Sequence, residues 1–448
     1  MSSPQLETVR TLQQQEETPL FSGLLAHARR RPVQFHIPGH KRGAGMAADF
    51  REFIGENALS IDLINIAPVD DLHHPQGIIK EAQELAAAAF GADQTFFSVQ
   101  GTSGAIMAMI LAVVGPGEKI LVPRNAHKSV MTALVLTGAV PVFMQPEIDH
   151  TLGVAHGVSL STIRATLDAH PDAAAVLVVN PTYFGVAADL KGIVDLAHSR
   201  GIPVLVDEAH GAHVHFHERL PLSAMQAGAD MAATSIHKLG GSLTQSSILN
   251  LRTGLVNPQR VQVAMSMLTT TSTSYLLLAS LDVARRELAL RGRERLERAI
   301  ALAEEARAAI NRIPGLYCFG REIVGDRSSS YDFDPTKLCI CVKELGVTGI
   351  EIENALREEF NIEVELSDLY NILCVVSLGD SREDVEALVR ALAELSRRYH
   401  TLRPANRVRV EVAETLRLAL TPRDAFFALT ENVPLHAAAD RIAAEFVM

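Results

Sequence analysis

The sequence has few cysteines, no excess of positive charge and no long hydrophobic run, and each absence excludes a class of protein. The net charge of −11 argues against a nucleic acid or an anionic membrane as the partner. The longest apolar stretch, Ala105–Val114, is well short of the roughly 18 residues that a membrane-spanning helix needs. The N-terminus is polar and lacks the apolar core of a signal peptide. We therefore expect a soluble, cytoplasmic protein with no membrane or nucleic-acid partner.

The four cysteines form no metal-binding or redox motif, because none is part of a Cys-x-x-Cys pair. All four lie in the last third of the chain. Cys339 and Cys341 alternate within an apolar run, so we expect both on one face of a strand. Buried thiols in a reducing cytosol are the simplest interpretation of all four.

Seven apolar runs separated by helical periods predict the core of the protein. The runs are apolar on both faces, which is typical of strands in a mainly parallel sheet that helices cover on both sides. A seven-stranded sheet of this kind has an α/β architecture. The expected strands are Thr95–Val99, Lys119–Val122, Val140–Met144, Ala174–Val179, Pro203–Val206, Met231–Ser235 and Ser247–Leu251.

The chain is long enough for more than one domain. We expect an N-terminal arm at residues 1–50, a large domain at 51–310 and a small C-terminal α+β domain at 311–448. A long helix that begins near Tyr275 connects the two domains, and Pro314-Gly315 ends it. In the small domain we expect strands at Lys337–Val342, Ile362–Leu366 and Ile372–Leu378, and helices at Gly349–Phe360 and Arg382–Arg398.

Asp207 and Lys238 form the most informative pair in the sequence. Asp207 ends one apolar strand and Lys238 follows the next apolar run, so about one strand-helix-strand unit separates them and both reach one edge of the sheet. An enzyme that uses pyridoxal 5'-phosphate (PLP) needs these two groups. The lysine holds the aldehyde as a Schiff base, and the aspartate keeps the ring nitrogen protonated. The alternatives are a solvated surface lysine and a helix-capping aspartate.

Gln100-Gly101-Thr102-Ser103-Gly104 follows the first strand and opens a helix. Small residues and hydroxyls at a helix N-terminus form an anion site, because the backbone N–H groups there are free and the helix dipole is positive. We therefore assign this segment to the PLP phosphate, although a plain helix cap has the same pattern.

Several histidines lie near these segments. His127 begins a helix after the second strand, where its ring could stack on a pyridine face, although a lone histidine is more often structural. His210 follows Asp207 by three residues, and we expect it at the cofactor. His210, His213, His215 and His217 could also suggest a metal site, but alternating histidines on a strand would need a third ligand. We expect no metal.

Six motifs then reveal a family resemblance. They are His36-Ile37-Pro38-Gly39-His40-Lys41, Asp70-Asp71-Leu72-His73-His74-Pro75, Gly101-Thr102-Ser103-Gly104, Arg124-Asn125-Ala126-His127-Lys128-Ser129, Asp207-Glu208-Ala209-His210 and Ser235-Ile236-His237-Lys238. Together they resemble the Orn/Lys/Arg decarboxylases, which are PLP enzymes with the aspartate-aminotransferase-like fold. The resemblance covers nearly the whole chain and is greatest to the short bacterial arginine decarboxylases.

The resemblance implies a role for each motif. Lys238 would carry the Schiff base, Asp207 would pair with the pyridinium nitrogen and His127 would stack on the ring. The groups around the phosphate and the lysine would be Ser103, Gly104, Ser235 and His237. Thr271 and Ser272 lie in a segment that reaches the phosphate from the partner subunit in this family, which implies a homodimer or a dimer-based oligomer with shared active sites.

The implied reaction is the α-decarboxylation of a basic amino acid, with Lys238 or His237 returning a proton to Cα. Arginine, which would give agmatine and CO2 in polyamine biosynthesis, is the first choice of substrate, followed by lysine and ornithine. An aminotransferase or carbon–sulfur lyase on the same fold is a rival. A catalytically silent regulatory or partner-binding homologue is an alternative of another class.

A cationic substrate side chain needs a carboxylate partner, which is ideally bidentate for a guanidinium group. The candidates are Asp71, Glu365 and Asp368. Glu363 and Glu365 alternate, so both could share one face, although an exposed acidic strand has the same pattern. Family members of this type continue past Phe446-Val447-Met448, so we expect the small domain to be truncated relative to the family.

Overall fold

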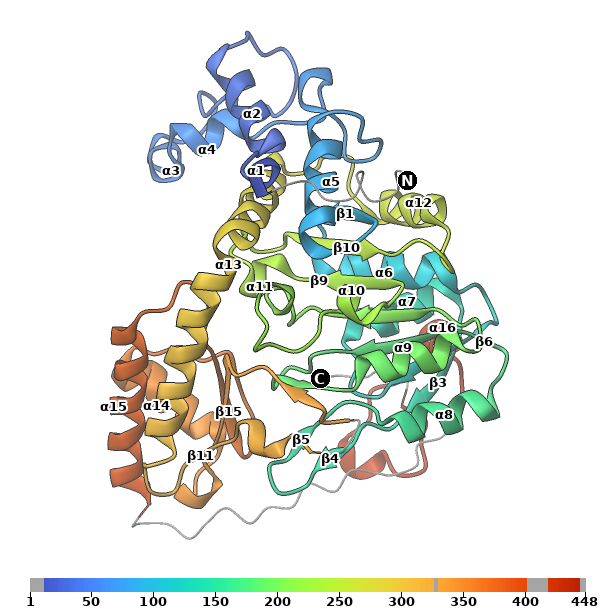
Figure 1. Cartoon of the computed structure of the whole chain (residues 1–448), viewed down its shortest axis with the longest axis vertical. Coiled ribbons are helices and arrows are strands. Elements are labelled where there is room, and N and C mark those ends of the chain that lie inside the picture. Colours follow the sequence, from blue (N-terminus) through green and yellow to red (C-terminus); the bar gives the residue numbers. More distant parts are fainter. Residues whose placement is uncertain (1–11, 326–328, 401–417, 444–448) are drawn as a thin grey trace, which may run out of the picture.

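The computed structural model describes residues 12–325, 329–400 and 418–443. Its centre is a seven-stranded sheet, from which the long helix α13 (Tyr275–Ile310) runs to a second, smaller sheet (Figure 1). β10 is antiparallel to both of its neighbours, and the other adjacent strands are parallel. In sheet order the strands are β1 (Gln94–Ser98), β10 (Ser247–Leu251), β9 (Met231–Thr234), β8 (Val204–Asp207), β6 (Ala173–Val179), β2 (Lys119–Pro123) and β3 (Val140–Met144). The predicted mainly parallel sheet is confirmed.

The strands are apolar on both faces because helices bury both faces. Along β8, Leu205 packs into one hydrophobic cluster while Val204 and Val206 pack into another on the opposite face. One face is covered by α6 (Gly101–Val113), α7 (Lys128–Thr137) and α12 (Pro258–Leu268). The other face is covered by α5 (Ile78–Phe90), α8 (Leu160–Ala169), α9 (Leu190–His198), α10 (Ala224–Ala227) and the start of α13.

The small domain is a four-stranded antiparallel sheet with two helices. The C-terminal half of α13 packs against it through Ala299, Ala303 and Ile310. Its elements are β11 (Tyr317–Cys318), β13 (Lys337–Cys341), β15 (Asn371–Val375), β14 (Leu366–Ser367), α14 (Gly349–Phe360) and α15 (Arg382–Tyr399). Cys339 and Cys341 lie in the same hydrophobic cluster, as their alternation predicted.

One predicted strand of the small domain is shorter than expected. We expected a strand over Ile362–Leu366, but β14 covers only Leu366–Ser367. The Asp368 carboxylate accepts hydrogen bonds from the backbone N–H groups of Tyr370 and Asn371, both at 2.7 Å. These bonds close a tight turn. β14 pairs with β15 only through Leu366 and Ser367, which directly precede this turn.

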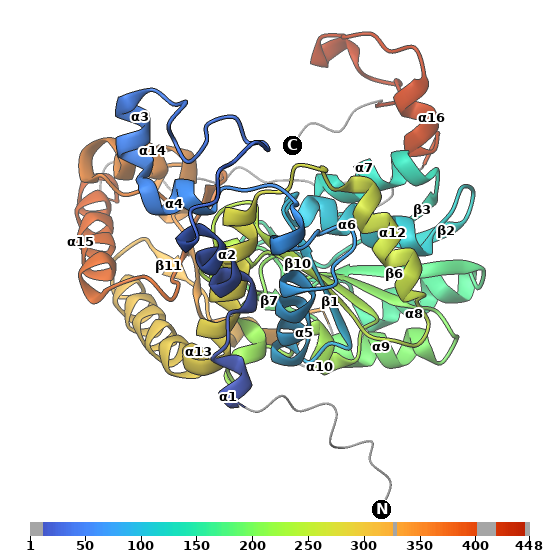
Figure 2. The ribbon, with the colours of Figure 1, turned by 90° about the horizontal axis from the view of Figure 1, so that it is seen from above.

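Two further segments join the large domain. α2 (Pro19–Arg29) buries Leu20 and Leu24 against α5 and α13, so this part of the predicted N-terminal arm belongs to the core. At the other end, α16 (Pro422–Phe427) lies against α7, where an Arg423 Nη atom donates to the Leu136 carbonyl at 3.3 Å (Figure 2). Residues 418–443 therefore do not extend the small sheet, and Phe446–Met448 lie outside the described residues.

The remaining short elements complete the N-terminal region and the loops. They are α1 (Leu12–Gln15), α3 (Ala48–Ile54), α4 (Glu56–Ile61), β4 (Ile148–Asp149), β5 (Val154–Ala155), β7 (Val186–Ala187), α11 (Ile236–Leu239) and β12 (Asp332–Phe333).

No helix among the described residues combines the length and the apolar character that crossing a membrane requires.

Candidate active site

Asp207 and Lys238 meet at the carboxyl edge of the sheet. β8 ends at Asp207, and its parallel neighbour β9 ends at Thr234, four residues before Lys238 in α11. Neighbouring parallel strands end at the same edge, which is where open α/β sheets place their ligands. The negative charge of Asp207 is close enough to favour the protonated form of Lys238.

The Lys238 side chain lies between two rings. Its Nζ atom is 2.7 Å from Nε2 of His210 and 5.6 Å from the centre of the Tyr183 ring. Burial lowers the pKa of Lys238, while Asp207 and Glu365 oppose this change. Burial, together with the charge of Lys238, also holds the pKa of His210 well below its usual value. His210 is therefore neutral near pH 7 and accepts a hydrogen bond from Lys238.

Asp207 is a buried carboxyl group with spare hydrogen-bonding capacity. Among the described residues, its one donor is the Ala209 backbone N–H, at 3.1 Å from Oδ1. Burial raises the pKa of Asp207 to about 6, and Lys238 partly opposes the rise. A carboxylate in this state gains strongly from a cationic N–H donor, such as a protonated pyridine ring.

Glu208 supports the same loop and was not among the predicted site residues. It is buried, and it accepts hydrogen bonds from the Ala224 backbone N–H at 2.6 Å and from the Thr234 hydroxyl at 3.1 Å. Burial raises its pKa to about 8, so Glu208 is largely protonated at pH 7. A second acid beside Asp207 at a buried strand end was the available signal.

Three hydroxyl groups lie together beside the N-terminus of α6. The Thr102 hydroxyl is hydrogen-bonded to the hydroxyls of Ser235 and Ser247, which come from the ends of β9 and β10. Gly101 has a φ of +68°, and a Cβ atom there would meet nothing within 4 Å. Ser103 follows in the first turn of α6, where its backbone N–H has no partner within the helix, and Gly104 donates its N–H to the Gln100 carbonyl at 3.2 Å. The predicted phosphate segment thus faces Ser235.

The rings of His127 and His237, which were both predicted to lie near Lys238, are held in fixed orientations by hydrogen bonds. Nδ1 of His127 accepts a hydrogen bond from the Ser129 backbone N–H at 3.2 Å and so caps α7. Burial lowers the pKa of His127, and the charge of Lys238 lowers it further. His237 donates from Nδ1 to the Ser246 carbonyl at 2.9 Å.

Tyr183 and Glu365 connect the two domains across this edge. Tyr183 lies in the loop after β6, and its ring centre is 4.1 Å from that of His210. Its hydroxyl donates to a Glu365 carboxylate oxygen from the small domain. Burial and this bond raise the pKa of Tyr183. Tyr183 was not among the predicted site residues, although it follows a predicted strand at the functional edge of the sheet.

The other predicted residues lie elsewhere in the chain. Asp71 accepts a hydrogen bond from the His73 backbone N–H at 3.0 Å and lies near Tyr275, and Asp368 closes the turn between β14 and β15. Thr271 and Ser272 are exposed between α12 and α13. Within the described part of a single chain, the structure does not bring these four residues to Lys238.

The histidines that follow His210 have separate partners. His213 contacts Asp334 at 3.0 Å, His215 contacts the Ser223 hydroxyl at 2.9 Å and His217 contacts Glu297 at 2.9 Å. No group of three histidine, cysteine or acidic side chains in the described ranges has an arrangement that could hold a metal ion.

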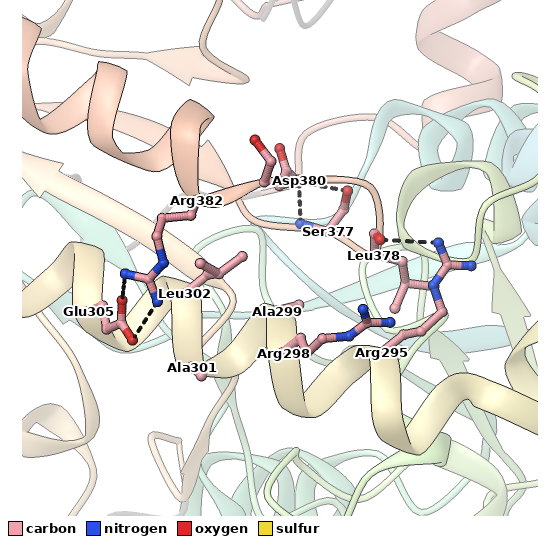
Figure 3. A pocket seen from close by; sticks show the side chains of 11 residues that line it. Arg295, Arg298, Ala299, Ala301, Leu302, Glu305, Ser377, Leu378, Asp380 and Arg382 are labelled. Atoms are coloured by element: carbon pink, nitrogen blue, oxygen red, sulfur yellow. Dashed lines mark hydrogen bonds and ion pairs between the residues drawn. The ribbon is translucent and has the colours of Figure 1, made fainter.

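A cavity of about 370 Å³ lies between α13 and the start of α15 (Figure 3). None of its lining residues is a predicted site residue, and its charges are largely satisfied from within. Arg382 pairs with Glu305, and Arg295 reaches the Leu378 carbonyl (Figure 3). This cavity therefore does not compete with the strand ends as the reaction site.

Solved structures with a similar fold include lysine decarboxylase A from Pseudomonas aeruginosa and an alanine–glyoxylate aminotransferase from Nostoc. The first has a TM-score of 0.76 and 26% sequence identity over 87% of this chain, which spans 61% of that longer chain. The second has a TM-score of 0.57 at 20% identity, covers 71% of this chain and 86% of its own, and supports the fold alone. The predicted aspartate-aminotransferase-like fold is confirmed.

Sequence comparisons are more specific. Proteins named arginine decarboxylase from Halalkalibacterium halodurans and Bacillus subtilis are 65% and 64% identical over 98% and 97% of this chain, and the match covers 89% of each. The family model described as Orn/Lys/Arg decarboxylase, major domain, matches residues 18–384. The chain therefore belongs to the Orn/Lys/Arg decarboxylase family.

Proposed function

We propose that this protein converts L-arginine to agmatine and CO2 and that Lys238 carries its PLP cofactor. The observation that carries the proposal is the meeting of Asp207 and Lys238 at the carboxyl edge of the sheet. The identity of 62–65% to four proteins named arginine decarboxylase supports arginine as the substrate.

The residues present fit this cofactor. The buried Asp207 has no cationic hydrogen-bond donor in the part of the chain that the structure describes, and it would hold the ring nitrogen. The hydroxyls of Thr102 and Ser235, with the N-terminal turn of α6, would bind the phosphate, and the neutral His127 ring would lie against the pyridine face. When bound, PLP supplies an electron sink for the electron pair that remains at Cα after CO2 leaves.

Lys238 and its neighbours would move the protons. The neutral His210 accepts a hydrogen bond from Lys238, so the lysine nitrogen is held in one position rather than being free in solvent. A lowered lysine pKa increases the share of the neutral amine, which is the form that exchanges with a substrate amine. Lys238 or His237 then returns one proton to Cα, which replaces the lost carboxylate.

Glu365 would bind the guanidinium group of the substrate. It is the one predicted substrate acid that the structure brings near Lys238, and Tyr183 already holds one of its oxygens. A carboxylate fixed in this way favours paired hydrogen bonds to a planar guanidinium group. Asp71 and Asp368 serve other contacts in the single chain.

The active site would be completed in a homodimer. Thr271 and Ser272 are exposed and lie away from Lys238 of their own chain, as expected of residues that serve a partner's site. The N-terminal region also exposes large apolar side chains, among them Val33, Phe35 and Phe53. Exposed apolar side chains of this size are expected at a surface that a second copy covers.

Product identification tests the proposed function. The PLP-loaded protein is incubated separately with arginine, lysine and ornithine, and the amine and CO2 formed are measured. Agmatine from arginine, formed without a keto-acid acceptor, supports the proposal and excludes an aminotransferase. Faster formation of cadaverine or putrescine would assign lysine or ornithine instead, and no turnover of any of the three would indicate a silent homologue.

A further inference from the structure

A fully buried ion pair lies behind the rings at Lys238. Nζ of Lys337 is 3.0 Å from Oδ2 of Asp334, and both side chains are 0% exposed. The backbone N–H and the hydroxyl of Thr336 donate to the other Asp334 oxygen at 3.0 and 2.7 Å. Burial alone would raise the pKa of Asp334, but Lys337 and His213 outweigh it and hold the pKa well below its usual range.

This pair connects the small domain to two loops of the large domain. His213, in the loop after β8, contacts Oδ2 of Asp334 at 3.0 Å. Gly185, in the loop after β6, accepts a hydrogen bond from the Asp334 backbone N–H at 2.8 Å. The contact is close, because a Cβ atom on Gly185 would lie 2.8 Å from Cγ of Lys337.

The same two loops carry the rings beside Lys238. Tyr183 lies two residues before Gly185, and His210 lies three residues before His213. The two rings are 4.1 Å apart, and His210 is 2.7 Å from Nζ of Lys238. The charges of Lys337 and Asp334 both act on His210. A shift of either loop at the ion pair would therefore move a ring at the site.

Stability alone does not explain a buried pair of this kind. Removing two charges from water is costly, and apolar residues of the same volume often hold a protein together equally well. A network with defined donors and acceptors fixes one relative position of the segments that it joins, which apolar packing does less strictly.

We propose that Asp334 and Lys337 are positioning residues for the reaction. Through His213 and Gly185, they fix the two loops that place His210 and Tyr183 beside Lys238. The effect on turnover rests on the proposed function, whereas the effect on the loops does not.

The test removes both charges together so that neither is left unpaired. In the double variant Asp334→Asn/Lys337→Met, we expect kcat for arginine to fall about tenfold to a hundredfold, because small misplacements of reacting groups cost this much. The KM for arginine should rise less than kcat falls, since Glu365 itself is unchanged and loses at most the support of Tyr183. In the cofactor-free protein, hydrogen exchange in residues 180–187 and 208–216 should rise at least about tenfold.

The chain offers a matched control in a second buried ion pair with the same spacing, Asp282 and Arg285. The double variant Asp282→Asn/Arg285→Met should raise hydrogen exchange in residues 15–21 instead. Its kcat should stay within about twofold of the wild type.

An unchanged kcat and unchanged loop exchange in the Asp334/Lys337 variant overturn the proposal, as does an equal loss of kcat in the control.

If the double variant does not fold, the variant Thr336→Val tests the proposal instead, because it removes one hydrogen bond to Asp334 and nearly preserves the side-chain volume. A fall in kcat that exceeds any rise in KM then supports the proposal, and wild-type kcat overturns it. If the wild type makes no agmatine, the proposed function fails, and loop exchange still tests the positioning.

Discussion

Two buried ion pairs, each an aspartate followed three residues later by a cation, have different tasks in this protein. Asp282 and Arg285 lie on α13, where Asp282 accepts from the Leu20 and Phe21 backbone N–H groups at 3.0 and 3.2 Å. Arg285 donates to the Gln15 carbonyl at 2.6 Å. These contacts attach the N-terminal segment to the core, and none of them leads to Lys238.

Asp334 and Lys337 are equally buried, but their contacts lead to the strand ends. Their partner His213 is on the loop of His210, and their neighbour Gly185 is on the loop of Tyr183. Both regions thus share burial and an aspartate paired with a cation three residues later. The two pairs differ in what their contacts reach. The contacts of Asp334 and Lys337 lead to Lys238, a lysine with a lowered pKa, whereas those of Asp282 and Arg285 hold the N-terminal segment against the core.

The largest effect on activity is expected at Lys238. Replacing Lys238 with Ala should lower arginine decarboxylation by roughly 10³-fold or more, because no other group holds the cofactor covalently. The visible absorbance of the bound cofactor should shift or vanish as well. Activity and spectrum are measured on the purified variant, and retention of both would contradict the assigned role of Lys238.

Arg285 should give a large effect on stability alone. Arg285→Met leaves Asp282 buried without its cation, which should cost about 3–5 kcal/mol in the free energy of unfolding. Denaturant titration measures this cost. The kcat for arginine of the folded fraction should match that of the wild type, and a parallel loss of kcat would erase the contrast between the two regions.

Asp207 should reduce stability while it supports the reaction. Its pKa is about 6 in the folded protein and about 3.8 in the unfolded chain, so the folded state binds the extra proton between these values. Stability is therefore lost as the pH rises from about 4 to 6, by up to about 3 kcal/mol. Cofactor-free Asp207→Asn should be more stable than the wild type at pH 7.5, with a gain that shrinks below pH 6.

The same Asp207→Asn variant should lose about 10²–10³-fold in kcat for arginine, because it removes the fixed charge opposite the ring nitrogen. Thermal unfolding across the pH range and kcat are measured on the same preparations. Greater stability together with undiminished kcat would show that the burial of Asp207 costs stability and contributes nothing to the reaction.

Glu365 should show the smallest effect and the most selective one. Glu365→Gln removes the charge that faces the substrate side chain, so KM for arginine should rise about tenfold to a hundredfold. The kcat should change little. Glu363→Gln, two residues away on an exposed side chain that pairs with Arg357, is the control and should leave KM unchanged.

The parts of this account that depend on local pattern were predictable from the sequence. β8 and β9 are buried on both faces, so their apolar runs identified them, and their ends placed Asp207 and Lys238 correctly. Small residues and hydroxyl groups likewise marked the start of α6.

The parts that depend on contacts between distant segments were not predictable. The bond between Tyr183 and Glu365 joins residues 182 positions apart. In sequence, Asp334 precedes the expected strand that begins at Lys337, and no local pattern indicated that folding buries both residues against Gly185 and His213. Asp368 was expected near the substrate, but its carboxylate closes a hairpin turn.

The most direct test of the account is a competition for product. The PLP-loaded protein is given an equimolar mixture of arginine, lysine and ornithine, and the amines formed are identified by mass. We expect agmatine with an equal amount of CO2, and a rate that is lower by roughly 10³-fold or more in the Lys238→Ala variant. Cadaverine or putrescine as the main amine, or agmatine formed by Lys238→Ala at the rate of the wild type, would contradict the account.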